Sequence, residues 1–254
     1  MAGMTADMLD CIAEVLVRAK HAVVFTGAGI SAESGIPTFR GKDGLWEKYN
    51  AEEVASIEGF MRNPQAFWEF ARELIVKRKA EPNPAHYAIA ELERLGIVKA
   101  VITQNIDMLH QKAGSEEVIE LHGSLSRVEC LECGMIYAWE EVEKKLEFTV
   151  PRCECGSNYL KPAIVFFGEA LPAEAMRKAV EHASLCDVFI VVGSSLVVYP
   201  AAYLPFMAKD AGARLILINA EPTHVDEHFD HVVHGKAGEV LPEVVKRLNK
   251  FLSP

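Results

Sequence analysis

Four of the six cysteines fall into two close pairs, Cys130 with Cys133 and Cys153 with Cys155, with nineteen residues between the pairs. This spacing is close to that of a zinc ribbon, and four thiolates suit the tetrahedral geometry of zinc. A site closed by four thiolates leaves no position for a reacting water, so we predict a structural metal. The second pair is one residue tighter than the usual Cys-x-x-Cys pattern, and four unliganded thiols are the alternative.

A glycine-rich motif runs from Gly27 to Ala32 directly after the short apolar run 22–25. Glycines at Gly27 and Gly29 would let the backbone approach a pyrophosphate, whose charge the amides of a helix N-terminus can hold. The motif therefore favours phosphate binding. A turn that merely closes a strand is the alternative.

The continuation of this motif, 33–41, carries glycine and proline where a dehydrogenase would run into a regular helix. We therefore expect a mobile loop that folds over the ligand, with Phe39 and Arg40 as contacts. The alternative is an ordinary surface loop whose Phe39 packs into the core.

An amide and a carboxylate, Asn105 and Asp107, follow the apolar run 98–102. Open α/β sheets place ligand sites at the carboxyl ends of their strands. Such a pair can bind a carboxamide and a sugar hydroxyl together. The alternative is an Asx-type cap for a helix that begins near Met108.

A histidine, His122, lies between the apolar pair 118–119 and the cysteine-containing segment. Imidazole titrates near neutral pH, so a histidine at this boundary is a candidate general base. A structural or exposed histidine is the alternative.

Two further polar turns, 193–195 and 219–221, follow apolar runs. Hydroxyl groups in the first turn suit phosphate or ribose, and Asn219 with Glu221 could bind an adenosine ribose. Ordinary turn chemistry between a strand and a helix is the alternative.

A cluster of histidines and acids lies near the end of the chain. Its members are His224, His228, His231 and His234, with Asp226, Glu227 and Asp230 among them. Because no clear helix would align these side chains, we predict a solvated loop, and a second metal site is the alternative.

Short, continuous apolar runs predict the strands that position these residues. Such runs lie at 22–25, 98–102, 188–192 and 215–218, with a shorter one at 232–233. Helical patterns lie at 7–20, 84–95 and 172–183. Continuous apolar strands that alternate with helices indicate a parallel sheet covered on both faces. The predicted fold class is α/β, with a doubly wound parallel sheet.

Two segments interrupt this rhythm. The first, about 39–83, is aromatic-rich and helical in pattern, and the second, about 122–162, holds the paired cysteines and has little alternation of its own. We interpret them as a helical and a zinc-ribbon insertion that together form a smaller module. The chain 1–254 is then a single catalytic unit, whose core comprises about 7–38, 84–121 and 163–254.

Composition narrows the class of protein. A formal net charge of -10 over 254 residues argues against direct nucleic-acid binding, which needs clustered cationic surface. No apolar run reaches the length of a membrane span and no secretory h-region is present, so we expect a cytoplasmic protein without a membrane partner. Cys11 and Cys186 are predicted to be buried thiols. Nothing in the sequence indicates the oligomeric state.

Taken together, these blocks resemble the sirtuin family, of the prokaryotic single-domain type, in order and spacing. The matching blocks are 27–40, 104–107, His122-Gly123, the four cysteines, 166–169, 193–195, 219–221 and 236–239. The resemblance implies a Rossmann-type large domain and a small domain built from the helical and zinc-ribbon insertions. It also implies that NAD and an acylated lysine enter the cleft between the domains from opposite sides.

The resemblance assigns residues to sites by position. The cofactor residues would be Gly27, Ala28, Gly29, Ser31, Ala32, Phe39, Arg40, Gln104, Asn105, Ile106, Asp107, Gly193, Ser194, Ser195, Asn219, Glu221 and Ala237. Asn105, Asp107 and His122 would be catalytic. A substrate peptide would add as a strand between two edges. Those edges would be Val165, Phe167, Gly168 and Glu169 on one side and Val197, Val198 and Tyr199 on the other.

The implied reaction removes acetyl or another neutral acyl group from protein lysine and yields nicotinamide, O-acyl-ADP-ribose and free lysine. In the family mechanism the acyl oxygen attacks the nicotinamide ribose, and His122 then acts as base on a ribose hydroxyl. Family members that prefer succinyl or malonyl groups carry a Tyr-x-x-Arg pair, whose positions correspond here to Ala71 and Leu74. We therefore expect a neutral acyl group, with Arg72 or Arg78 as an alternative source of positive charge.

Two other functions stay open at this point. A mono-ADP-ribosyltransferase would use the same NAD activation, and a non-catalytic NAD-binding sensor would keep His122 as a structural residue. A conventional dehydrogenase is disfavoured because the acidic ribose-binding residue and the regular first helix are both missing.

Overall fold

Six strands form the larger of two sheets in the computed structural model, which describes residues 5–41, 44–73, 80–146 and 148–252. The strands are β1 (Ala22–Thr26), β2 (Val98–Thr103), β3 (Val118–Glu120), β7 (Val188–Val192), β8 (Arg214–Asn219) and β9 (His231–His234). They lie in the order β3-β2-β1-β7-β8-β9, and every pairing is parallel. The order reverses between β1 and β7, and such a switch point is where open α/β sheets bind ligands.

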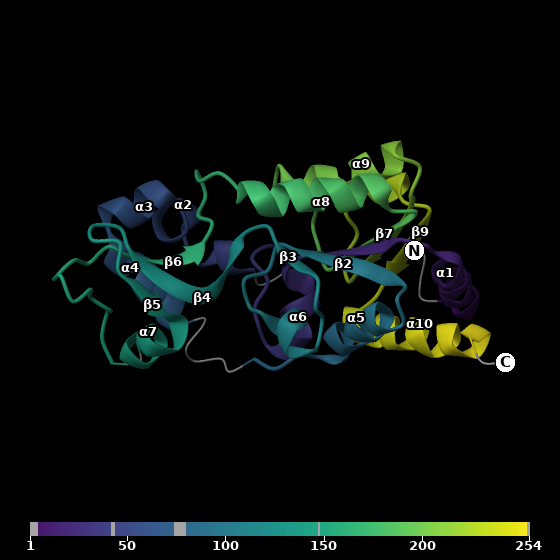
Figure 1. Cartoon of the computed structure of the whole chain (residues 1–254), viewed down its shortest axis with the longest axis horizontal. Helices are drawn as coiled ribbons and strands as arrows, with labels where there is room; N and C mark the ends of the chain where they lie inside the picture. The colour runs from purple at the N-terminus through teal and green to yellow at the C-terminus, as the bar shows by residue number, and fades with distance from the viewer. Residues whose placement is uncertain (1–4, 42–43, 74–79, 147, 253–254) are drawn as a thin grey trace.

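Helices cover both faces of this sheet (Figure 1). On one face lie α8 (Ala173–Leu185) and α9 (Leu204–Asp210), and on the other lie α1 (Ala6–Arg18), α5 (Pro84–Arg94) and α10 (Ala237–Leu252). None of the helices among the described residues combines the length and apolar character that a bilayer crossing requires.

Strand β1 shows why its apolar run is continuous. Val24 packs into the cluster beneath α1, α5 and α10, whereas Val23 and Phe25 pack into the cluster beneath α8 and α9. Successive side chains of a strand point to opposite faces, so a sheet covered on both sides requires apolar residues at every position. The predicted doubly wound α/β fold is confirmed, and the short run 232–233 lies within β9.

The smaller sheet is antiparallel, with β4 (Gly123–Cys130) in the centre between β5 (Ile136–Ala138) and β6 (Leu160–Ile164). Helix α7 (Trp139–Leu146) follows β5. These strands were missed because a register shift between Gly123 and Val128 interrupts the alternation of buried and exposed side chains along β4. At the start of β4, Gly123 pairs with Ile164 at the end of β6.

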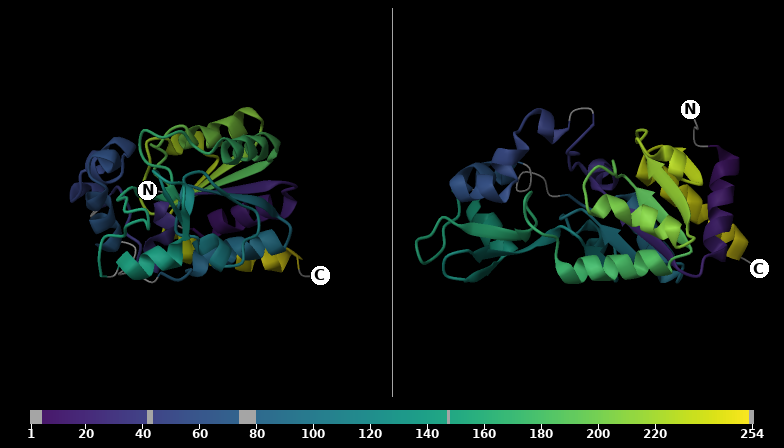
Figure 2. Two further views of the ribbon diagram at one scale, coloured as in Figure 1. Left: turned by 60° about the vertical axis from the view of Figure 1, so that its left-hand side comes forward. Right: turned by 90° about the horizontal axis from the view of Figure 1, so that it is seen from above.

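Short helices pack against this smaller sheet (Figure 2). They are α2 (Ala51–Val54), α3 (Ile57–Arg62) and α4 (Pro64–Ala71), with the single turn η2 (Leu45–Glu47) before them. Ser56 and Asn63 cap α3 and α4 by accepting the backbone N–H of Gly59 and Ala66. Phe60, Phe67 and Trp68 enter a common core with residues of the sheet, and the Trp68 indole donates to the Leu160 carbonyl at 3.1 Å.

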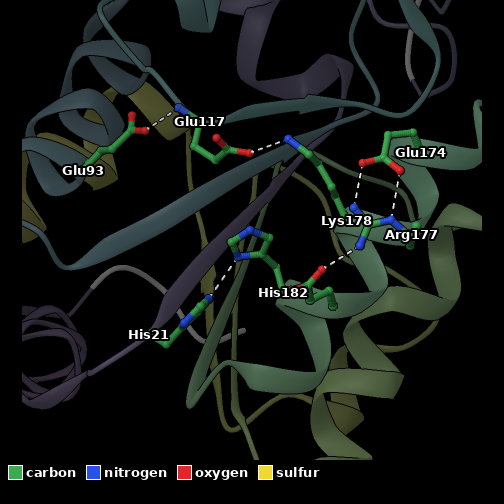
Figure 3. Close-up of polar contacts among 8 residues, drawn as sticks. His21, Glu93, Glu117, Glu174, Arg177, Lys178 and His182 are labelled. Carbon is green, nitrogen blue, oxygen red and sulfur yellow. Dashed lines mark hydrogen bonds and ion pairs between the residues drawn. The ribbon is translucent and has the colours of Figure 1, made fainter.

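Helix α8 is fixed at the amino-terminal end of the large sheet by polar contacts (Figure 3). His182 Nδ1 lies 3.0 Å from Nε2 of His21, which directly precedes β1, and Lys178 Nζ lies 3.3 Å from a carboxylate oxygen of Glu117. Glu93 on α5 accepts the backbone N–H of Glu117 at 2.8 Å. These contacts lie at the opposite end of the strands from the polar turns at 193–195 and 219–221.

Two predictions about side chains are wrong. Cys11 is exposed rather than buried, because α1 buries Leu9, Ile12 and Leu16 and position 11 falls off that face, whereas Cys186 is buried as predicted. The histidine cluster is not a solvated loop throughout. His231 and His234 belong to β9, because the apolar pair between them joins the sheet beside β8.

Candidate functional site

The predicted site residues follow the carboxyl ends of four parallel strands. Gly27 follows β1, Gln104 follows β2, Gly193 follows β7, and Asn219 is the last residue of β8. Because these strands are parallel neighbours, their ends meet at one edge of the sheet, across the switch point between β1 and β7.

The two glycine turns at this edge are in direct contact. The N–H of Gly29 donates to the carbonyl of Gly193 at 2.8 Å, and the N–H of Gly27 donates to the carbonyl of Val192 at 3.1 Å. A Cβ atom on Gly27 or Gly29 would lie 2.8 Å from the backbone of Gly193. The two turns can therefore touch only because both positions are glycine, and such close turns at the carboxyl ends of the strands suit the approach of a pyrophosphate.

After the glycine turn the chain forms a short 3-10 helix, η1 (Ala28–Ser34), which ends at Gly35 and does not continue as an α-helix. Phe39 is 37% exposed and stacks on Trp46 with ring centroids 5.1 Å apart. The alternative in which Phe39 packs into the core is thus excluded. Trp46 also contacts Phe70 and Phe167, so an aromatic cluster joins this loop to the predicted peptide edge.

Asn105 and Asp107 are held by one serine of η1. The Ser31 hydroxyl donates to Asp107 Oδ2 at 2.6 Å, and Asn105 Nδ2 donates to Ser31 Oγ at 3.2 Å and to the Gly27 carbonyl at 3.1 Å. Asp107 Oδ1 accepts the N–H of Leu109, which begins helix α6 (Leu109–Lys112), at 2.9 Å. The Asx-type cap of the alternative is therefore present, and the same two side chains also lie beside the glycine turn.

A buried histidine, His86, stands behind this serine. Its Nδ1 accepts the N–H of Asn83 at 3.3 Å, so its Nε2 carries the proton and faces Ser31 Oγ at 3.5 Å. Burial lowers the pKa of His86, which keeps the ring neutral. His86 could not be identified from the sequence, because a histidine inside an amphipathic helix pattern gives no separate signal.

His122 is oriented by the backbone. Its Nδ1 lies 2.9 Å from the Gln104 carbonyl, and because a carbonyl only accepts, Nδ1 donates and Nε2 keeps a free lone pair. Burial lowers the pKa of His122, against a smaller opposing effect of this hydrogen bond. The imidazole is therefore neutral at neutral pH and able to accept a proton at Nε2.

The remaining cofactor candidates surround this centre. Gln104 Nε2 donates to Ser194 Oγ at 2.9 Å, whereas Ser195 is exposed. Asn219 Nδ2 donates to the Glu221 carbonyl at 2.7 Å, and the Glu221 carboxylate lies beside Gly41. Glu33 accepts the N–H of Gly238 at 2.7 Å, which joins η1 to the start of α10, where Ala237 is buried.

The two predicted peptide edges present exposed apolar side chains: Phe167, Val197 and Tyr199. Phe167 pairs with the segment 55–57, accepting the N–H of Ile57 at 3.0 Å and donating to the carbonyl of Ala55 at 2.9 Å. Glu169 forms an ion pair with the mostly buried Lys161 at 2.9 Å. The edge is thus tied to both the helical segment and the small sheet.

The four paired cysteines converge, with all four Sγ atoms within 4.8 Å of one another. Cys130 and Cys155 lie 3.8 Å apart and Cys133 and Cys153 lie 3.5 Å apart. Tetrahedral zinc at a Zn–S distance of 2.3 Å places its sulfurs about 3.8 Å apart, so these residues fit zinc. Among the described residues, no other group of three or more metal-binding side chains is close enough to share an ion.

Only some of the positions that are expected to set acyl specificity lie among the described residues. Ala71 is buried on α4, whereas Leu74 and Arg78 lie outside the described residues. Arg72 Nε donates to the Leu146 carbonyl at 2.8 Å, so its guanidinium is directed at the end of α7.

Comparison with known proteins agrees with this geometry. Residues 27–200 match the model of the Sir2 family. The chain is 64% identical over 249 residues to NAD-dependent protein deacylase 2 of Archaeoglobus fulgidus, covering 97% of this chain and 98% of that protein.

Solved structures give the same result. A Sir2 enzyme whose structure addresses the mechanism and regulation of Sir2 enzymes is 62% identical to this chain. The two structures superpose with a TM-score of 0.94, and the match covers 97% of this chain and 100% of that one. Sir2Af2 bound to a myristoylated histone peptide is 56% identical, with a TM-score of 0.88 over 98% and 99%. A Sir2 protein with deacetylated p53 peptide and 3'-O-acetyl ADP-ribose is 42% identical, with a TM-score of 0.89 over 94% and 97%. This chain belongs to the Sir2 family, the sirtuins.

Proposed function

We propose that this chain is an NAD-dependent protein-lysine deacylase. It removes acetyl or another neutral acyl group from lysine side chains and yields nicotinamide, O-acyl-ADP-ribose and free lysine. One observation carries the proposal beyond binding: His122 is held by the Gln104 carbonyl so that a neutral Nε2 is available as a base. The names of the relatives, which include deacylases and deacetylases, support the same reaction.

NAD supplies the ribose carbon that accepts the acyl oxygen and the nicotinamide that leaves. The glycine turns at Gly27–Gly29 and Gly193 would hold its pyrophosphate, and Asn219 with Glu221 would hold its adenosine ribose. Asn105 and Asp107 would bind the nicotinamide end, where Ser31 fixes both side chains relative to each other. A carboxamide offers both a donor and an acceptor, which a carboxylate and an amide can satisfy together.

His122 then moves one proton. Its Nε2 accepts the proton of a ribose hydroxyl, which frees that oxygen to attack the acyl carbon. Because Nδ1 stays bound to the Gln104 carbonyl, the ring keeps its orientation as the charge develops, and the carbonyl stabilises the imidazolium.

The substrate is an acylated lysine within an extended protein segment. Such a segment would lie as an added strand between 165–169 and 197–199, an arrangement that reads backbone more than sequence. The buried Ala71 and the aromatic cluster of Phe39, Trp46 and Phe167 favour a neutral acyl chain over an acidic one. A relative that binds a myristoylated peptide supports long neutral chains as well. We place the reaction in the cytoplasm, where the cysteine cluster stays reduced.

The test follows nicotinamide release and peptide mass during incubation of the protein with an acetyl-lysine peptide, with and without NAD. Deacylation should require NAD and produce O-acetyl-ADP-ribose. His122→Ala should lower kcat/KM by about 10²- to 10⁴-fold, the usual contribution of a general base, while NAD binding persists. His224→Ala, which removes an exposed histidine, is the matched control. Full activity in His122→Ala, or hydride transfer in place of acyl transfer, would overturn the proposal.

A further inference from the structure

A second histidine, His110, lies beneath the site and has no part in the reaction just described. It is 1% exposed, and its Nε2 lies 3.0 Å from the hydroxyl of Thr26. The Thr26 hydroxyl lies 2.8 Å from that of Thr103, which accepts the backbone N–H of Asn105 at 3.0 Å. A chain of three buried polar side chains thus leads from His110 to the amide of Asn105.

The hydrogen bonds of this chain run in one direction. Thr26 donates its only hydroxyl proton to Thr103, so its oxygen must accept from His110, and His110 Nε2 therefore carries the ring proton. His110 Nδ1 is then an acceptor, and none of the described residues donates a hydrogen bond to it. Burial lowers the pKa of His110 to about 3, so the ring remains a neutral donor across the working pH range.

The position of this chain is unusual for a sheet core. Thr26 and Thr103 are the last residues of β1 and β2 and are paired in register, whereas the other buried residues of the two strands are apolar. Apolar side chains of similar size would fill the space without the cost of burying polar groups. The two threonines directly precede Gly27 and Gln104, which lie at the site.

The ring of His110 also contacts that of His86, with centroids 5.0 Å apart in an edge-to-face arrangement. His86 faces Ser31, and Ser31 donates to Asp107. Two neighbouring buried rings therefore support the two ends of the segment 105–107, one through Ser31 and the other through the two threonines.

We propose that His110 is a positioning residue for the nicotinamide end of the site. Through Thr26 and Thr103 it holds the backbone amide of Asn105, and with it the segment whose side chains would contact the carboxamide. The inference rests on the proposed function, because that function assigns Asn105 and Asp107 to nicotinamide.

Two pairs of variants test this assignment. His110→Phe keeps a ring without the donor, and His110→Gln returns an N–H group near the place of Nε2. Thr26→Val removes the hydroxyl at nearly constant shape, and Thr26→Ser keeps it. The measurements are hydrogen exchange of the Asn105 amide by NMR, the inhibition constant of nicotinamide, and kcat and KM for the acyl peptide.

His110→Phe and Thr26→Val should each raise the Asn105 exchange rate and the nicotinamide inhibition constant by about tenfold, the effect of losing one buried hydrogen bond. The KM for peptide should not change, and His110→Gln and Thr26→Ser should recover most of the loss. If exchange rises equally along β1 and β2 without recovery in these variants, His110 merely fills the core and the proposal fails. It also fails if Asn105 exchange is unchanged in His110→Phe.

The exchange measurement separates this inference from the proposed function. A wild-type protein without deacylase activity would overturn the function, while Asn105 exchange in the four variants would still decide whether His110 holds that amide.

Discussion

The two sheets of this sirtuin are stabilised by different means. The large sheet is enclosed by two extensive apolar clusters, one on each face. The small sheet shares a single aromatic-rich cluster with short helices, and four cysteines lie at one end of it. A small unit that buries little apolar surface needs a crosslink or a metal, whereas a large one does not. The two halves therefore differ in what stabilises them: apolar layers in the large sheet, and in the small sheet a cysteine cluster that fits a metal.

The largest expected effect comes from removing the metal. Cys133→Ser should abolish stoichiometric zinc binding, and since structural zinc sites contribute on the order of 10 kcal/mol, the small sheet should unfold. Hydrogen exchange should then be rapid along β4–β6 and remain slow along β1, β2 and β7, and activity should be lost. Cys11→Ser, at an exposed thiol, is the control. A Cys133→Ser variant that binds no zinc and is still active would contradict the claim that a metal stabilises the small sheet.

The complementary change is a cavity in the large sheet. Phe189 is fully buried on β7 and packs against Phe25. Phe189→Ala should therefore lower the free energy of unfolding by about 3–5 kcal/mol. Urea denaturation measures this loss, and zinc content of the folded protein should stay unchanged. Phe148→Ala, at a side chain that is 84% exposed, should have little effect. Equal losses in both variants would show that the apolar layers do not stabilise the sheet as argued.

The smallest effect concerns pH at the boundary between the sheets. Burial lowers the pKa of His122 below 6.5, and the base is active only when neutral, so activity should fall as pH decreases through that lowered pKa. A profile of kcat/KM from about pH 5 to about pH 8 should therefore show its acidic midpoint below 6.5. Loosening the small sheet with Val128→Ala should expose the imidazole and raise the midpoint towards 6.5. A wild-type midpoint above 6.5 would contradict this account of the burial of His122.

The large sheet could be predicted from sequence because burial on both faces forces continuous apolar runs. The candidate site could be predicted in outline for a related reason, since parallel strands bring their carboxyl ends together. The small sheet could not, because the irregular register of β4 removes the period of two that marks a strand. β3 is only three residues long, which is too short for its apolar pair to indicate a strand.

The supporting contacts beneath the site were beyond sequence reasoning. Thr26, Thr103 and His110 come from separate segments, and Thr26 and His110 are 84 positions apart in the sequence. Each of the three alone is typical of an ordinary core or turn residue. The prediction for Cys11 is wrong for a different reason. Cys11 lies within the apolar pattern of α1, but on the exposed side of the helix. Periodicity specifies which face a residue occupies only when several of its neighbours agree.

The pairing of Gly123 with Ile164 has a consequence for how such an enzyme diversifies. Gly123 begins and Ile164 ends the small sheet that lies between β3 and α8, and because the two residues are direct neighbours, the inserted segment begins and ends at one place. Insertions of this kind can be exchanged between proteins, lengthened or rewritten without moving the strands that carry them. Descendants of one ancestor could therefore change the segment 123–164 repeatedly while inheriting the six-stranded sheet intact.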